Sequence, residues 1–258
     1  EEEAARLAKE AETKGFEVTL GYNDREGDFK WSVNANIGSS KGKAIYLGGV
    51  DFIEGGGFEN ENITRLVPGQ DLYHYYGLVM DGIYQTQAEV DAVFTADPGQ
   101  TVVHPGDIRF KDLNGDGQID NADKTKIGSS IPDFTYGFNF DANYKNWDFN
   151  VFFNGVQGRD LINTNLYDLQ GMTRLFNAGT EVLNRWTGPG TSNTVPRAGG
   201  APQNYGISTR YLEDGSFLRL RNLTIGYTLP NDMLGKDLFS KFRIYVSGQN
   251  LITFTDYS

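Results

Sequence analysis

Six segments of the chain alternate regularly between apolar and polar residues. In the clearest of them, Asp133–Tyr144, every second residue from Phe134 onward is apolar, and most of the residues between are polar. Successive side chains of a β-strand point to opposite faces, so this period of two predicts strands with one apolar and one polar face. The six predicted strands are Phe16–Asn23, Phe29–Ile37, Asp133–Tyr144, Trp147–Asn154, Phe217–Leu229 and Lys241–Leu251.

The segment Phe217–Leu229 departs from this pattern at its centre. Leu218 and Leu220 have one parity, whereas Leu223 and the apolar residues after it have the other. One extra residue in a strand reverses the face to which the following side chains point. A β-bulge near Arg221–Asn222 is therefore predicted, because it returns all of these apolar residues to one face.

The connections between the predicted strands differ greatly in length. Within each consecutive pair the turn has about two to twelve residues, whereas residues 38–132 and 157–216 form two long connections. Short turns at one end of the strands and long loops at the other are typical of outer-membrane β-barrels, whose strands are about 9–11 residues long. The pattern predicts an all-β, antiparallel segment of a transmembrane barrel, about six strands of a larger barrel with long external loops.

A soluble antiparallel sandwich is the alternative, because its strands alternate in the same way. In a sandwich the apolar faces point inward and cover each other, whereas in a membrane barrel they point outward to lipid. On this alternative the chain is a calcium-stabilised extracellular β domain, either an adhesin or a glycan-binding module.

Composition excludes several classes of protein. The net charge of −11 argues against nucleic-acid binding, which needs basic patches. The chain has no Cys, so it can form neither disulfides nor thiolate metal sites. Aromatic residues make up 13% of the chain although its mean hydropathy is −0.46. A barrel wall with an apolar outer face and a wet inner face accounts for both values.

The first thirteen residues differ from the rest of the chain. Residues 1–13 are charged and rich in Ala, and Ala4, Leu7, Ala8 and Ala11 fall on one helical stripe. We expect a short N-terminal helix here, as an extension of separate origin, and expect residues 14–258 to form the partial barrel.

Residues 112–123 have the spacing of a calcium-binding loop. Calcium prefers six to eight oxygen ligands, and oxygen side chains fall at loop positions 1, 3, 5, 9 and 12. Gly117 occupies position 6, where the chain must turn sharply, and Ile119 can anchor the loop in a core. A turn region rich in Asn, Asp and Gly is the simpler interpretation. The predicted ligands of a structural Ca²⁺ are Asp112, Asn114, Asp116, Gln118 through its backbone carbonyl, Asp120 and Asp123.

The residues that resemble catalytic motifs lack the features that catalysis needs, and the chain is predicted not to be an enzyme. Gly38–Gly42 matches the nucleophile-elbow pattern, but the residues after it favour an extended strand rather than the helix that this motif needs. His74 and His104 are the only histidines, and each is interpreted as a loop or rim residue.

The long connections contain two local signals. Thr86 is placed to cap a short helix over Gln87–Val93, with Glu89 completing a capping box. Residues 187–204 are dense in Gly, Pro, Thr and Asn and are predicted to form an irregular surface loop.

Together these segments resemble the C-terminal part of SusC/RagA-type TonB-dependent transporters. The resemblance extends over residues 14–258 and depends on the order and spacing of several motifs. They are Lys14–Glu17, Trp31–Asn36, Tyr76–Tyr84, Gly106–Asp120, Ile127–Gly128, Ile131–Gly137, Phe152–Gly158, Asn184–Trp186, Phe217–Pro230 and Arg243–Leu251.

The resemblance implies an outer-membrane barrel of about 22 strands in a Gram-negative bacterium of the Bacteroidota. Such a barrel imports oligosaccharides or peptides, with a SusD-like lipoprotein as its lid and the TonB complex as its energy source, acting through a plug region that has no counterpart here. Six strands are fewer than the eight that the smallest bacterial barrels need to close. The chain is accordingly expected to be a barrel fragment that contacts outer-membrane lipid.

Overall fold

The computed structural model describes residues 9–59, 61–93, 102–172, 177–200, 202–230 and 241–257. The chain divides into two compact units. The sheet unit comprises residues 12–42, 131–160 and 214–258. The connection unit comprises residues 1–11, 43–130 and 161–213, and so consists mainly of the two long connections.

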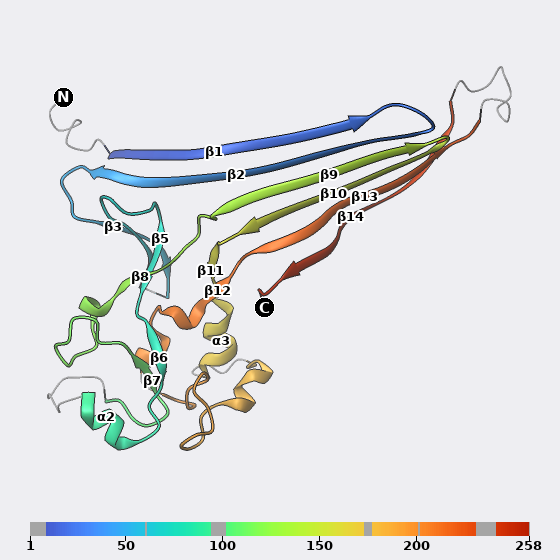
Figure 1. The fold of residues 1–258 in the computed structure, drawn as a ribbon. Helices are drawn as coiled ribbons and strands as arrows, with labels where there is room; N and C mark the ends of the chain where they lie inside the picture. Colours follow the sequence, from blue (N-terminus) through green and yellow to red (C-terminus); the bar gives the residue numbers. More distant parts are fainter. Residues whose placement is uncertain are drawn as a thin grey trace. The chain divides into compact units, whose positions relative to one another are not determined.

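The sheet unit is built on one sheet of six strands (Figure 1). Its strand order is β1, β2, β9, β10, β13, β14, so each predicted hairpin pairs with the next one along the chain. This confirms all six predicted strands and adds the pairing between hairpins. The strands are β1 (Lys9–Asp24), β2 (Phe29–Leu47), β9 (Phe134–Tyr144), β10 (Trp147–Gln157), β13 (Phe217–Thr228) and β14 (Arg243–Thr255).

The predicted helix over residues 1–13 is wrong where the structure describes it. Residues 9–13 belong to β1, which crosses the expected boundary at Lys14 without a break. Residues 1–8 lie outside the described part of the chain. The physical reason is tertiary: β2 extends to Leu47, and pairing with it outweighs the weak helix propensity of a short Ala- and Glu-rich segment.

The predicted bulge in β13 is confirmed. Asn222 lies opposite Phe152 of β10, whereas Leu220 lies opposite the next residue, Phe153. Arg221 is therefore the extra residue. Because of this shift, Leu220 points to the same face as Leu223 despite their different parity.

The connection unit contains two further sheets and several short helices. A sheet with the order β3, β4, β5, β8 and a pair formed by β6 and β7 provide its framework. Leu78, Ile108 and Phe110 form one buried cluster, and Tyr84, Val90 and Val103 form another. The strands are β3 (Ile53–Phe58), β4 (Glu61–Leu66), β5 (His74–Gly77), β6 (Met80–Ile83), β7 (Ile108–Phe110) and β8 (Thr125–Ser129). The first long connection therefore contributes packed structure rather than loop alone.

The chain also contains a pair of short strands and several short helices. Strands β11 (Asp160–Ile162) and β12 (Leu212–Asp214) pair with each other. None of the helices in the described ranges is long and apolar enough to cross a membrane, a finding that concerns helices alone. The helices are α2 (Gln87–Val93), α3 (Asn165–Gly171) and the 3-10 turns η1 (Asn121–Asp123), η2 (Thr180–Asn184), η3 (Pro202–Tyr205) and η4 (Thr209–Tyr211).

The predicted helix at Gln87–Val93 is confirmed, with a modified cap. The Glu89 backbone N–H donates to Thr86 Oγ1 at 3.3 Å, as expected for an N-cap. The Glu89 carboxylate accepts from the backbone N–H of Gln85 at 2.8 Å, one residue before the position of a standard capping box.

Residues 187–200 lack helix and strand structure, as predicted, whereas residues 202–204 belong to the 3-10 turn η3. The irregular part is not simply a surface loop. Val195 and Pro196 are buried, and the Trp186 backbone N–H donates to the Val195 carbonyl at 2.9 Å. Sequence composition indicates where regular structure ends, but it does not show which loop residues pack inside.

Candidate functional site

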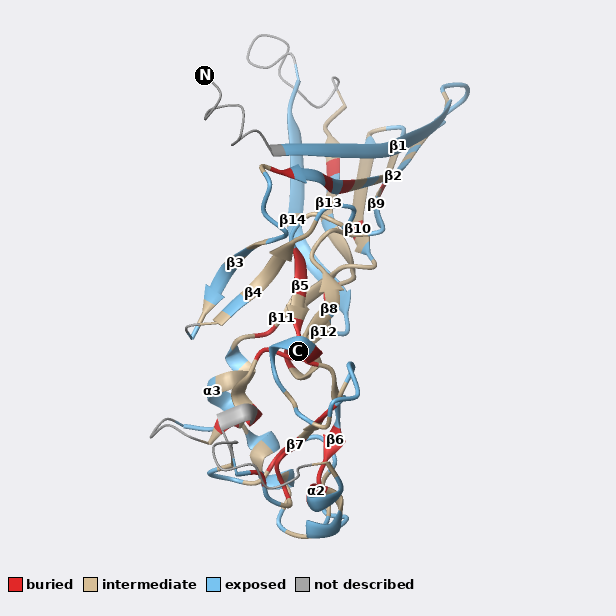
Figure 2. Ribbon diagram, turned by 90° about the vertical axis from the view of Figure 1, so that its left-hand side faces the viewer, coloured by how far each residue is buried: buried red, intermediate tan, exposed pale blue. Residues whose placement is uncertain are grey.

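The apolar face of the six-stranded sheet is open to its surroundings. Leu20 of β1 is 71% exposed, and Ile244 and Val246 of β14 are 57% and 76% exposed. In Figure 2 both of these strands have the colour of exposed residues. In a sandwich a second sheet would cover such side chains. The exposure therefore contradicts the soluble sandwich and fits an apolar face that meets lipid.

A row of aromatic side chains crosses this face at one end. Phe29 pairs with Tyr144, Tyr144 with Trp147, and Trp147 with Tyr227, so four adjacent strands each contribute one ring. The ring centroids are 6.5 Å apart for Phe29 and Tyr144 and 4.8 Å apart for Trp147 and Tyr227. Aromatic rows at the ends of barrel strands lie at the boundary between lipid and water.

The opposite face of the sheet carries a chain of polar contacts. Asn150 Nδ2 donates to Asp141 Oδ1 at 2.8 Å, and its own Oδ1 accepts from Asn222 Nδ2 at 2.8 Å. Thr224 and Ser247 share a hydrogen bond of 2.9 Å between their hydroxyl groups. Polar side chains on β9, β10, β13 and β14 thus satisfy each other, which suits a wall that faces water.

The predicted calcium loop folds as a compact turn. Asp112 Oδ1 accepts from the Gly115 N–H at 2.6 Å, and its Oδ2 accepts from the Gly117 N–H at 2.8 Å. These backbone hydrogen bonds, with the one from Gly117 strongest, lower the pKa of Asp112. Gly117 has a φ of +79°, as position 6 requires, and Ile119 packs against the cluster formed by Leu78, Ile108 and Phe110.

The other predicted ligands face the backbone of the same loop. Asp123 is fully buried and accepts from the Leu113 N–H at 2.8 Å and from the Asp120 N–H at 2.9 Å. Three further side-chain oxygens accept at 2.7 to 2.9 Å, namely Asn114 Oδ1 from Asp116, Asp116 Oδ1 from Gln118, and Asp120 Oδ1 from Ala122. Over the described ranges, no group of three or more His, Cys, Asp or Glu side chains is arranged to hold a metal ion. The calcium site stays a prediction.

The structure places the two histidines and the nucleophile-like motif in three different environments. His104 is exposed, as expected, but His74 is fully buried in β5, with Nδ1 3.0 Å from the Asp71 carbonyl. The rim position predicted for His74 is wrong, because β5 lies inside its sheet between β4 and β8. Residues 38–42 lie within β2, so no strand-to-helix turn exposes Ser40 as a nucleophile.

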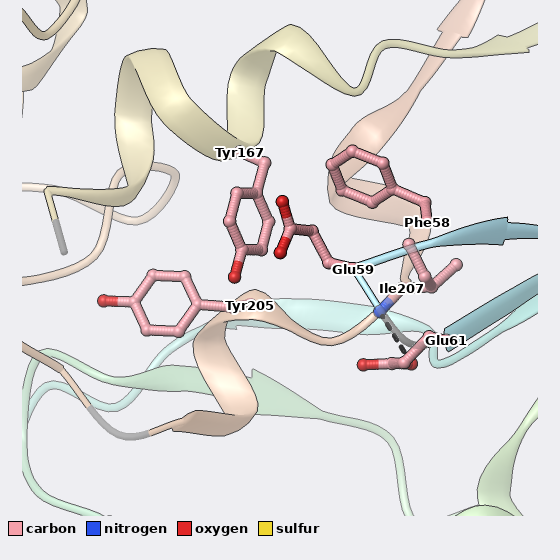
Figure 3. A pocket seen from close by; sticks show the side chains of 6 residues that line it. All are labelled: Phe58, Glu59, Glu61, Tyr167, Tyr205 and Ile207. Carbon is pink, nitrogen blue, oxygen red and sulfur yellow. Dashed lines mark hydrogen bonds between the residues drawn. The ribbon is translucent and has the colours of Figure 1, made fainter. Parts of the chain in front are cut away.

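An acidic pocket of about 200 Å³ lies in the connection unit (Figure 3). It is lined by Phe58, Glu59, Glu61, Tyr167, Tyr205 and Ile207. The rings of Phe58 and Tyr167 meet edge to face with their centroids 5.4 Å apart, and Figure 3 shows the Glu59 side chain among those that line the pocket. Glu59 has a φ of +50°, a backbone region that Glu seldom adopts. Aromatic walls with carboxylates suit a ligand that carries hydroxyl or ammonium donors.

Sequence reasoning missed this pocket because its members are far apart in the chain. Residues 58–61 come from the hairpin of β3 and β4, whereas residues 167, 205 and 207 come from the second long connection. A local signal was available at Glu59, which directly follows β3 at a turn position where Asn, Asp or Gly is favoured.

Comparison with known proteins identifies the relatives of this chain. No family model matches it. It is 38% identical over 255 residues to TonB-dependent receptor P3 of Formosa agariphila, a match that covers 96% of this chain and 25% of that receptor. It is also 28% identical over 240 residues to TonB-dependent receptor SusC of Bacteroides thetaiotaomicron, covering 89% of this chain and 22% of that protein. The chain is a relative of the SusC/RagA-type TonB-dependent receptors.

The fold agrees with this relationship. A solved structure of the RagAB peptide transporter superimposes with a TM-score of 0.74 at 25% identity, covering 96% of this chain and 26% of that one. The predicted family and the antiparallel β class are therefore confirmed. The related proteins are receptors and transporters rather than enzymes, in agreement with the prediction. The chain spans about a quarter of the length of the curated TonB-dependent receptors that it matches.

Proposed function

We propose that this chain forms part of the wall of an outer-membrane transporter in a Gram-negative bacterium of the Bacteroidota. One observation carries the proposal: the apolar face of the six-stranded sheet has exposed large apolar side chains on every strand and ends with a row of aromatic rings. Apolar side chains that face outward are stable in contact with lipid, whereas the same apolar surface in water would promote aggregation.

The transporter is proposed to import oligosaccharides or peptides. A related structure is described as that of a peptide transporter, which supports the peptide class. The aromatic and acidic pocket of Figure 3 offers contacts for the hydroxyl groups of a sugar or for the amino groups of a peptide. The relationship to SusC supports a SusD-like lipoprotein as partner and energy from the TonB complex.

The proposed transport is tested in a strain that lacks the full-length receptor. We expect the strain to lose uptake of labelled peptides or of labelled oligosaccharides, and to regain it when the gene is restored. A protonophore should abolish uptake in the restored strain, because TonB transmits energy from the inner membrane. Unchanged uptake of both substrate classes in the deletion strain would reject the proposal.

The proposed lipoprotein partner is tested by purification. The full-length receptor, tagged and extracted in mild detergent, is expected to bring a SusD-like lipoprotein with it in a fixed ratio. A receptor that purifies alone from native membranes would argue against a stable lid.

We further propose that residues 112–123 bind a structural Ca²⁺. The support is the spacing of the oxygen side chains and the sharp turn at Gly117. The carboxylates of this loop accept hydrogen bonds from its backbone N–H groups, so they must turn away from these donors to bind a metal ion. The free energy of calcium binding is proposed to exceed the cost of this rearrangement.

Calcium is expected to raise the thermal midpoint of the full-length receptor in detergent relative to excess chelator. At a calcium concentration of 100 times Kd the stabilisation is about 2.7 kcal/mol. Asp112→Asn should remove this difference, whereas Asp51→Asn, a change at an exposed residue outside the loop, should keep it. A midpoint that the chelator does not alter in the unmodified receptor would reject the site.

A further inference from the structure

The connection unit contains a second pocket, of about 460 Å³, with mixed lining. Its apolar wall is formed by Met80, Leu166 and Val195, and its polar wall includes Gln170, Glu181 and Arg210. The Met80 backbone N–H donates to Thr209 Oγ1 at 2.9 Å, which ties β6 to the turn that carries Arg210. The volume lies in the range of small-molecule sites.

Arg210 is held in this pocket by neutral acceptors alone. Its Nη1 donates to the Thr194 carbonyl at 2.7 Å, and its Nη2 donates to Gln170 Oε1 at 2.9 Å. No carboxylate oxygen of a described residue lies within 4.0 Å of its nitrogens. The Tyr211 side chain, which is neutral, also interacts with the guanidinium. Since a guanidinium has five N–H donors, these contacts still leave donors for another acceptor.

Three other arginines of the same unit are paired with carboxylates. Arg197 Nε lies 2.9 Å from Asp107 Oδ1, and Arg109 Nε lies 3.2 Å from Asp81 Oδ2. Arg65 Nη2 lies 2.5 Å from Glu54 Oε1. Arg210 therefore differs from these three arginines, because it is half-buried in a pocket without a carboxylate partner.

Partial burial of a charge without an anionic partner is unfavourable for the free protein. Desolvation lowers the pKa of Arg210, and the opposing effect comes from the side chains of Tyr211 and Tyr205 rather than from a carboxylate. A bound anion would supply the missing charge and accept the remaining N–H groups in the planar, bidentate geometry that guanidinium favours.

We propose that this pocket binds an organic carboxylate with an apolar substituent, with the carboxylate on Arg210 and the substituent against Met80, Leu166 and Val195. The inference does not depend on transport, since it follows from the charge and the lining of the pocket. Glu181 lies on the same pocket but is exposed, so solvent screens its repulsion of a ligand anion.

N-acetyl-L-leucine is the probe for this site, because it combines one carboxylate with one branched apolar group and has no ammonium. Binding to the full-length receptor in detergent is measured by isothermal titration calorimetry. We expect N-acetyl-L-leucinamide, which has the same shape without the charge, to bind at least about tenfold more weakly. Equal binding of acid and amide, or no binding of the acid, would overturn the proposal.

Arg210→Gln tests the residue while keeping a hydrogen-bonding group in its place. The substitution should abolish binding of the probe and leave the thermal midpoint unchanged or higher, since it removes an uncompensated cation. Arg210→Lys keeps the charge without the bidentate geometry and should weaken binding by about tenfold. Arg185→Gln is the matched control, because Arg185 contacts the backbone carbonyl of Val182 and does not line the pocket. If Arg210→Gln bound N-acetyl-L-leucine with unchanged affinity, the ligand would bind elsewhere and the proposal would be wrong.

Three further probes distinguish the possible sources of the carboxylate. N-acetyl-Ala-Leu represents the end of a peptide, N-acetylglutamic acid α-amide represents an acidic side chain, and glucuronate represents an acidic sugar. The apolar wall predicts the order N-acetyl-Ala-Leu first and glucuronate last. Glucuronate as the tightest ligand would contradict the role assigned to the apolar wall.

Discussion

At the residue scale, the carboxylate of Asp107 connects several parts of the connection unit. It is fully buried and accepts from Arg197 Nε at 2.9 Å, from Asn204 Nδ2 at 2.9 Å and from the His104 backbone N–H at 2.9 Å. These donors come from residues 104, 197 and 204, which belong to both long connections. One side chain thus joins segments that are about 90 residues apart in sequence.

Arg197→Gln is expected to destabilise the receptor strongly, because it leaves a buried carboxylate without its counter-charge. We expect a loss of about 3 kcal/mol, the lower end for a broken buried pair, since the Arg197 side chain keeps 27% exposure. Chemical unfolding of the full-length receptor, followed by near-ultraviolet circular dichroism, measures the change.

A second substitution at the partner separates charge from shape in this pair. Asp107→Asn combined with Arg197→Gln makes the pair neutral and should recover part of the lost stability. The double variant would contradict this explanation if it were less stable than Arg197→Gln alone.

At the scale of one element, the bulge in β13 decides which side chains face outward. With Arg221 as the extra residue, Leu218 and Leu220 share a face with Leu223 and Ile225. The sequence shows the parity change, and the paired strand β10 confirms where the extra residue lies. This part of the fold was predictable because the face to which each side chain of a strand points follows from a period of two.

Deletion of Arg221 is expected to be tolerated. Its removal joins Leu220 directly to Asn222, which already lie opposite the consecutive residues Phe153 and Phe152 of β10. The apolar face then stays intact. Deletion of Thr224, which lies in regular pairing with Asn150, should instead reverse one half of the strand and prevent folding. The amount of heat-modifiable, folded receptor in the outer membrane measures both outcomes, and equal effects of the two deletions would refute the assignment of the bulge.

At the scale of the whole molecule, the two faces of the sheet should respond oppositely to charge. Val246 lies on the apolar face of β14 and is 76% exposed, so an Arg there would be harmless in water. Next to lipid, the same substitution costs about 2–4 kcal/mol near the bilayer midplane. Val246→Arg is therefore expected to reduce the folded receptor in outer membranes.

Ser247→Arg provides the matched control for that experiment. Ser247 is the next residue of β14 and lies on the polar face, where its hydroxyl pairs with that of Thr224. An Arg on a water-facing wall should leave the amount of folded receptor nearly unchanged. Equal loss in both variants would show that the apolar face does not meet lipid.

The sequence alone determined the six strands, the bulge near Arg221, the helix at residues 87–93 and the relationship to SusC/RagA-type receptors. Each of these depends on local period, on capping or on motif order, which a linear chain displays directly. Strand β1 was longer than predicted, because Lys9–Thr13 gains its strand conformation from pairing with β2.

Only the tertiary structure decided the rest. The aromatic row needs the register of four strands, the burial of His74 needs neighbours on both sides of β5, and the pocket around Arg210 needs five separate segments to converge. The sequence also does not show that Arg210 lacks a carboxylate partner, because that depends on which side chains the fold brings close to it. Long-range pairing and packing fix these features, and neither has a local signature in the amino-acid sequence.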